Sequence, residues 1–208
     1  MENSKAFLAF KKQIDATGTM KKEGYDLSLF SKAYDWERKD AETIIWQSFY
    51  KNGDADLLAF FPELKFYDGI SALKTMLWSE KTTEGLRLLI AFYLYQSSGE
   101  KEIIEIIKDI ITNRNFNYSD ISLLIHLNKS KEVYDLFKYI YKKATDKIEV
   151  SCAITGLLYN KGYIRDIDDV EELSNNSSIR KRMKSLDVSE REEIIQKFER
   201  GEFDAFIE

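Results

Sequence analysis

The densest group of candidate ligands in the sequence is a run of five carboxylates: Asp166, Asp168, Asp169, Glu171 and Glu172. Two acids three residues apart on a helix could hold a divalent cation. Metal sites in helical bundles, however, take ligands from facing helices, often with a Glu-x-x-His pattern, which this sequence lacks. We therefore expect a solvated acidic helix face without a metal. If this face has a function, we expect it to be electrostatic docking of a basic partner protein.

His126 and Cys152 are the only histidine and cysteine, and they are the residues best suited to catalysis. His126 follows apolar residues where a helix is expected to end, which is typical of a structural or capping histidine. Cys152 can act as a nucleophile only beside a base, and a small thiol packed between helices is commoner. We predict no catalytic residue, no cofactor and no enzyme. The alternative is an enzyme whose site is assembled from distant helices, using His126 and the acidic run.

Three tyrosines in the expected helix over residues 131–142 are candidates for contact with a partner. On a helical wheel, Tyr134, Tyr139 and Tyr141 flank the apolar stripe rather than join it. Exposed tyrosines often anchor protein interfaces, whereas tyrosines at the edge of a stripe commonly pack at the border between two helices. The sequence leaves both roles open.

A basic run, Arg180-Lys-Arg-Met-Lys184, follows the acidic one. Four cations in five residues could contact phosphate, but the net charge of −5 disfavours nucleic acid, whose recognition needs a basic stripe. The same charge disfavours an anionic membrane surface. We expect the two runs to neutralise each other, and we expect neither nucleic acid nor a membrane as a partner.

The elements that carry these residues are expected to be helices. The 208 residues include one proline and nine glycines, and 44% are hydrophobic, which is enough for a packed core. The longest apolar run, residues 88–95, is too short to span a membrane. No long apolar stretch typical of a signal peptide is seen near Met1. We predict an all-α fold and a cytoplasmic location.

Capping residues and breakers set the expected helix boundaries. Asp40 is predicted to begin one helix, and Asp54 to cap a short helix that stops at Pro62. Further predicted caps and stops are Ser130, and either Thr145 or Asp146, before later helices, and Gly53 and Gly162 at helix ends. The acidic run is predicted to lie on a short helix within residues 164–173, with its acids pointing outward. The inward face of that helix would be formed by four apolar residues, each three positions after the one before: Ile164, Ile167, Val170 and Leu173.

Three segments of the chain have the pattern of stacked helices. Thr83–Gln96 is apolar on all sides, Glu100–Thr112 has one isoleucine stripe, and Lys147–Tyr159 is apolar on two faces. Helix pairs of roughly 30 to 40 residues follow one another. In this respect, Thr83 to Leu173 resembles HEAT-type helical repeats. The resemblance implies stacked antiparallel helix pairs in an α-solenoid whose curved surface binds a macromolecule. An irregular helical bundle is the alternative.

These patterns favour one all-helical domain over residues 1–208, with residues 1–38 forming an N-terminal helical segment packed on it. The predicted function is a non-enzymatic protein–protein interaction module. One concrete form is a bacterial immunity protein that neutralises a partner toxin. An adaptor or regulatory scaffold is equally compatible. The expected partner is a protein, and a basic one is favoured. The sequence leaves the oligomeric state open.

Overall fold

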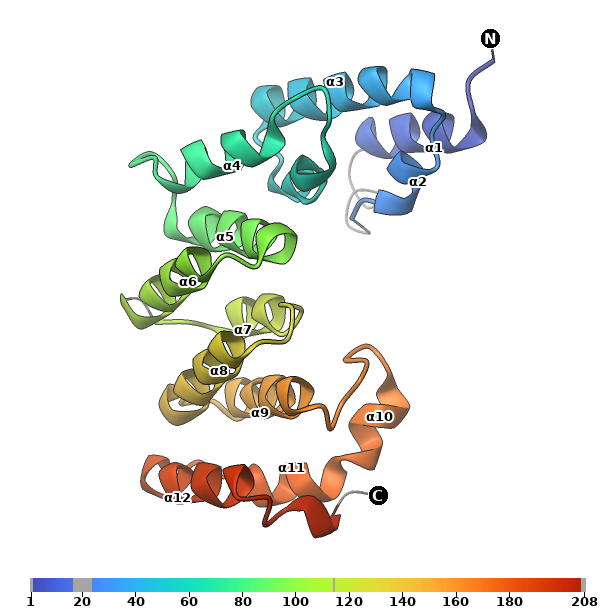
Figure 1. Ribbon diagram of the computed structural model, residues 1–208. Coiled ribbons are helices and arrows are strands. Elements are labelled where there is room, and N and C mark those ends of the chain that lie inside the picture. Colours follow the sequence, from blue (N-terminus) through green and yellow to red (C-terminus); the bar gives the residue numbers. More distant parts are fainter. Residues whose placement is uncertain (1, 17–23, 114, 207–208) are drawn as a thin grey trace. The chain divides into compact units, whose positions relative to one another are not determined.

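The computed structural model describes residues 2–16, 24–113 and 115–206. Within these ranges all regular structure is helical and no strand occurs, which confirms the predicted all-α fold (Figure 1). No helix of the described residues combines the length and the apolar character that a membrane span requires. The chain divides into two compact units, Met1–Ser97 and Ser98–Glu208. The single domain over residues 1–208 stays a prediction.

The helices of the first unit are α1 (Lys5–Ile14), α2 (Leu27–Ser31), α3 (Asp35–Asn52), the 3-10 helix η2 (Ala55–Glu63), α4 (Gly69–Leu77) and α5 (Glu84–Ser98), which ends at the unit boundary. The helices of the second unit are α6 (Lys101–Asn113), α7 (Tyr118–Leu124), α8 (Lys131–Lys143), α9 (Lys147–Lys161), α10 (Val170–Asn175), α11 (Ser177–Met183), α12 (Val188–Glu199) and the 3-10 helix η3 (Asp204–Phe206).

An aromatic cluster forms much of the core of the first unit. Phe10 of α1, Phe30 of α2 and Phe60 of η2 are all buried. Their ring centroids lie 5.9 Å (Phe10–Phe30), 5.8 Å (Phe10–Phe60) and 5.4 Å (Phe30–Phe60) apart, within the range of favourable aromatic contacts. These contacts attach α1 and α2 to η2, so the described part of residues 1–38 belongs to the packed unit.

Two buried carboxylates of α3 fix the chain around that helix. Glu37 accepts hydrogen bonds from the backbone N–H and the hydroxyl of Ser4, both at 2.6 Å, and from the backbone N–H of Tyr34 at 2.8 Å. Glu42 accepts one from the backbone N–H of Lys65 at 3.0 Å. Each carboxylate thus replaces lost water with protein donors, as a buried charge requires.

The second unit is built around α8 and α9, which pack directly against each other. Three residues join the two helices, a connection length typical of antiparallel neighbours. Gly156 of α9 lies against the ring of Phe137, and a Cβ added there would come within 2.3 Å of that ring. α7 and α11 contact α9, whereas α6 and α12 contact α8. The glycine therefore sets how closely the central pair approaches.

Most of the predicted caps are present. The side chains of Asp54, Ser130 and Asp146 each accept a hydrogen bond from the first turn of η2, α8 and α9, respectively. Gly53 and Gly162 end α3 and α9 with φ of 64° and 85°, a left-handed conformation that glycine adopts without strain.

Three predicted boundaries are wrong. α3 begins at Asp35 rather than after Asp40, because the Glu37 carboxylate already binds the backbone N–H of Tyr34. Pro62 lies inside η2 and does not end it. The predicted helix within residues 164–173 begins only at Val170, because Asp169 caps it there.

Candidate protein-binding surface

The acidic run forms an ordered turn that leads into the first turn of α10, rather than one helix face. We call residues 165–172 the acidic turn. The Glu172 carboxylate accepts hydrogen bonds from the backbone N–H groups of Arg165 at 2.6 Å and Asp166 at 2.9 Å. Asp166 in turn accepts one from the backbone N–H of Asp168 at 2.9 Å. Aspartate side chains readily bind nearby backbone in this way, which competes with helix formation.

The third structural acid is Asp169, the N-cap of α10. Its carboxylate accepts hydrogen bonds from the backbone N–H groups of Glu171 at 2.8 Å and Glu172 at 3.3 Å. Asp166, Asp169 and Glu172 therefore bind the backbone of the turn itself. Capping of this kind contributes about 1 kcal/mol.

The two remaining acids of the run, Asp168 and Glu171, are exposed to solvent. Between them lies Val170, whose side chain is 78% exposed, the highest exposure among the large hydrophobic residues that the structure describes. This corrects the prediction that Val170 faces inward: α10 starts at Val170, so no helical turn precedes it to bring it against the core. The turn thus presents two carboxylates and an apolar side chain on a fixed backbone.

Contacts at the base of the acidic turn hold it to the second unit. Ile164 is fully buried, and its carbonyl oxygen accepts a hydrogen bond from Lys129 Nζ at 3.1 Å. That ammonium group also lies 3.9 Å from the centroid of the Tyr159 ring. The buried Asn176 side-chain amide donates to the carbonyl of Tyr163 at 3.1 Å. These contacts position the turn relative to α9.

The three candidate tyrosines have different environments. Tyr134 is half-buried, and its hydroxyl donates to Glu199 Oε1 of α12 at 3.3 Å. Burial and the Glu199 carboxylate raise the pKa of Tyr134 well above its usual range. Tyr139 is also half-buried, and it lines a hollow together with Phe116 and Lys143.

Tyr141 is fully buried, which corrects the prediction that it flanks the core. Its hydroxyl donates to the carbonyl of Met183 at the end of α11, and burial raises its pKa to about 12. Tyr141 is therefore a packing residue between α8 and α11 and drops out of the candidate surface. The helical wheel predicted that Tyr141 lies beside the core, but α11 and α12 cover that side of α8 and bury it.

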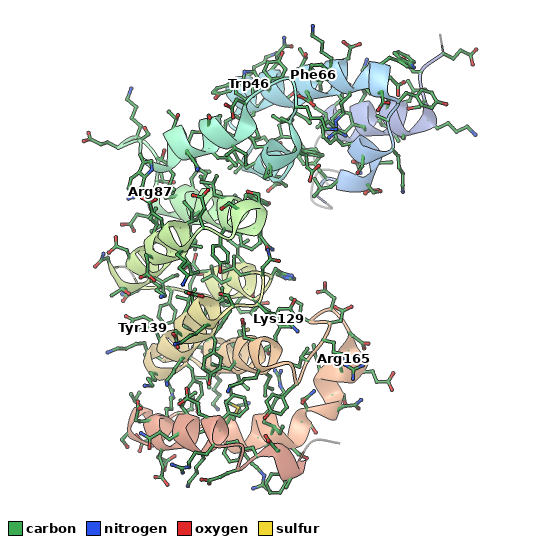
Figure 2. The ribbon with its side chains drawn as sticks, in the orientation of Figure 1. Trp46, Phe66, Arg87, Lys129, Tyr139 and Arg165 are labelled. Carbon is green, nitrogen blue, oxygen red and sulfur yellow. The ribbon has the colours of Figure 1, made fainter. Side chains whose placement is uncertain are left out.

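The two remaining tyrosines and the acidic turn do not form one surface. Figure 2 labels Tyr139, on α8, and Arg165, and the two side chains lie on opposite sides of the second unit. Tyr134 is engaged with Glu199, so it is not a free neighbour of the turn. Of the predicted site residues, the structure brings together only the five acids.

The expected neutralisation of the acidic turn by the basic run is wrong for Arg180. Its guanidinium donates to the hydroxyls of Thr155 at 2.8 Å and Ser151 at 3.2 Å, both on α9. Cys152 lies next to this group, and burial raises the pKa of its thiol more than Arg180 lowers it. Cys152 is only partly buried, so the buried packing thiol predicted from the sequence is not what the structure shows.

His126, the other catalytic candidate, is exposed at the end of α7. Across the described residues, no three side chains of His, Cys, Asp or Glu are grouped so that they could hold a metal ion.

Arg191 of α12 is a structural residue that sequence patterns miss. Its side chain is fully buried and donates to the carbonyls of Tyr141 at 2.8 Å, Ala144 at 2.6 Å and Ser185 at 3.0 Å. It satisfies carbonyls at the end of α8, where the helix dipole favours a cation. In the sequence, Arg191 stands out only as one arginine within an acidic stretch. Its partners on α8 lie about 50 residues earlier, too far away to be read from a local pattern.

Comparison with known proteins found no matching family model, no matching curated protein and no matching solved structure. The resemblance to HEAT-type repeats stays a prediction.

Proposed function

We propose that this protein is a non-enzymatic protein–protein interaction module that docks a basic partner through the acidic turn. One observation carries the proposal. Three carboxylates hold the backbone of the turn, and this fixed backbone presents Asp168, Glu171 and the 78% exposed Val170 to solvent. A preformed surface loses less conformational entropy on binding than a mobile loop.

The chemistry of the turn matches a basic protein surface. Two exposed carboxylates attract Lys and Arg side chains and raise the association rate, and Val170 supplies an apolar contact at the centre. The net charge of −5 favours the same class of partner over nucleic acid. An immunity protein that neutralises a basic toxin in the cytoplasm is one form of this proposal, and an adaptor is another.

The test is capture of partners from the native host with the wild-type chain and with Asp168→Asn/Glu171→Gln as baits. Asp169 and Glu172 are left intact, because both bind backbone N–H groups and their loss would disturb the turn. A matched control, Glu102→Gln/Asp135→Asn, removes the same charge from exposed positions on α6 and α8.

The proposal predicts a basic protein that the wild type and the control retain and the turn variant loses, with all three chains equally folded by circular dichroism. Equal capture by all three chains would remove the acidic turn from the function.

A further inference from the structure

Arg180 is a half-buried cation that has no carboxylate partner among the residues that the structure describes. Its contacts within the described residues are the two hydroxyls of α9 and the neighbouring Cys152 thiol. Burial lowers the pKa of its guanidinium, since the charged form loses solvation. Charges that proteins bury are normally paired with an opposite charge or bonded at every donor.

Arg191 shows how this chain treats a buried arginine that is purely structural. Its Nε, Nη1 and Nη2 atoms all donate to backbone carbonyls, which together use most of its N–H groups. Arg180, by contrast, has five N–H groups and uses only two of them in hydrogen bonds within the described residues. It therefore keeps donors for a ligand.

The two hydroxyls beside Arg180 have different roles. Thr155 is buried, and its hydroxyl donates to the carbonyl of Ser151 at 3.1 Å while accepting from Arg180. Its single proton is used, so Thr155 positions the guanidinium. Ser151 is half-exposed and accepts from Arg180, which leaves its own proton for an incoming acceptor.

We propose that Arg180 and Ser151 form a binding site for an oxyanion group, a phosphate or a carboxylate, on the face shared by α9 and α11. The guanidinium supplies charge and two or more N–H donors, and the Ser151 hydroxyl supplies a further donor. Charge-assisted hydrogen bonds of this kind are stronger than those between neutral groups. The adjacent Cys152 thiol takes no part in the bonding.

Cys152 is the only cysteine of the chain, so it can report occupancy of the site. The experiment measures the labelling rate of Cys152 by a neutral disulfide reagent in inorganic phosphate, in acetate and in chloride at equal ionic strength. A bound oxyanion neutralises Arg180, which disfavours the thiolate, and it blocks approach to the sulfur. We expect phosphate to slow labelling about threefold or more relative to chloride.

Three variants separate binding from general salt effects. Arg180→Met should label at the same rate in phosphate and chloride, and Ser151→Ala should need more phosphate for the same protection. Lys181→Met, which removes an exposed cation from the same helix, should behave as the wild type does. Protection by acetate as well would place carboxylates among the ligands, and protection by phosphate alone would restrict the class to phosphoryl groups.

Equal labelling of the wild-type chain in phosphate, acetate and chloride overturns the proposal, and this result does not depend on whether any variant folds. Protection that persists in folded Arg180→Met would overturn it too. The site uses none of the residues of the acidic turn, so Asp168→Asn/Glu171→Gln should leave the phosphate effect unchanged.

Discussion

Glu37 shows at the residue scale how one buried carboxylate links distant parts of the chain. Burial raises the pKa of its carboxyl, but the hydrogen bonds from Ser4 and Tyr34 outweigh that effect, so its pKa lies below the usual value. A carboxyl with a lowered pKa in the folded state stabilises the fold fully above its unfolded pKa, about 4.3. That contribution is lost as pH falls through the lower, folded pKa.

Glu37→Gln should therefore lower the free energy of unfolding at pH 7. The amide replaces one carboxylate oxygen with an NH2 group, which cannot accept the hydrogen bonds that Ser4 and Tyr34 donate. The difference from the wild type should shrink below about pH 4, where the wild-type carboxyl also becomes protonated. Urea unfolding at several pH values measures this. Glu80→Gln, at an exposed position of the same unit, is the control and should show no such dependence. A difference that stays constant with pH would contradict the role given to the charge.

Gly156 carries a second prediction at this scale. A Cβ at this position would come within 2.3 Å of the Phe137 ring, so Gly156→Ala forces α8 and α9 apart. Overpacking should cost about 1–3 kcal/mol of stability, more than the gain in helix propensity from alanine. Gly85→Ala in α5, where a Cβ has open space, should be neutral or stabilising in the same thermal unfolding assay. Equal stability of Gly156→Ala and the wild type would show that the helix pair is more loosely packed.

The acidic turn is an element whose conformation depends on its own hydrogen bonds. Asp169→Ala removes the N-cap of α10 and should cost about 1 kcal/mol, whereas Asp168→Ala removes a solvent-exposed carboxylate and should cost little. Amide hydrogen exchange should show faster exchange in the first turn of α10 for Asp169→Ala only. Similar exchange in both variants would mean that the cap does not hold the turn.

The helix boundaries could be predicted from the sequence where the residues that set them lie next to the helix. The caps Asp54 and Asp146 lie within three residues of the N–H groups they bind, and Gly53 and Gly162 lie directly after the helices they end. Asp40 and the helix within residues 164–173 were misplaced because polar side chains there had several possible backbone partners. The Asx-type bonds of Asp166 compete with a helical wheel that assumes regular geometry.

At the scale of the whole molecule, contacts between residues far apart in the chain could not be predicted from the sequence patterns. Arg191 bonds to Tyr141 and Ala144 about 50 residues earlier, and Glu37 bonds to Ser4, 33 residues earlier. Neither pairing has a local signature. The same limit applies to the candidate site: the five acids were visible as a run, but which of them bind backbone and which face solvent depends on the folded turn.

Asp168 and Glu171 of the acidic turn are the two residues that we propose to contact a basic partner. The direct measurement is the dissociation constant of the captured partner, purified and titrated against three chains at two salt concentrations. Asp168→Asn/Glu171→Gln should weaken binding about tenfold at low salt, and by less at high salt, since salt screens exposed charges. Glu102→Gln/Asp135→Asn should stay within about twofold of the wild type. Equal dissociation constants for the wild type and the turn variant would contradict the claim.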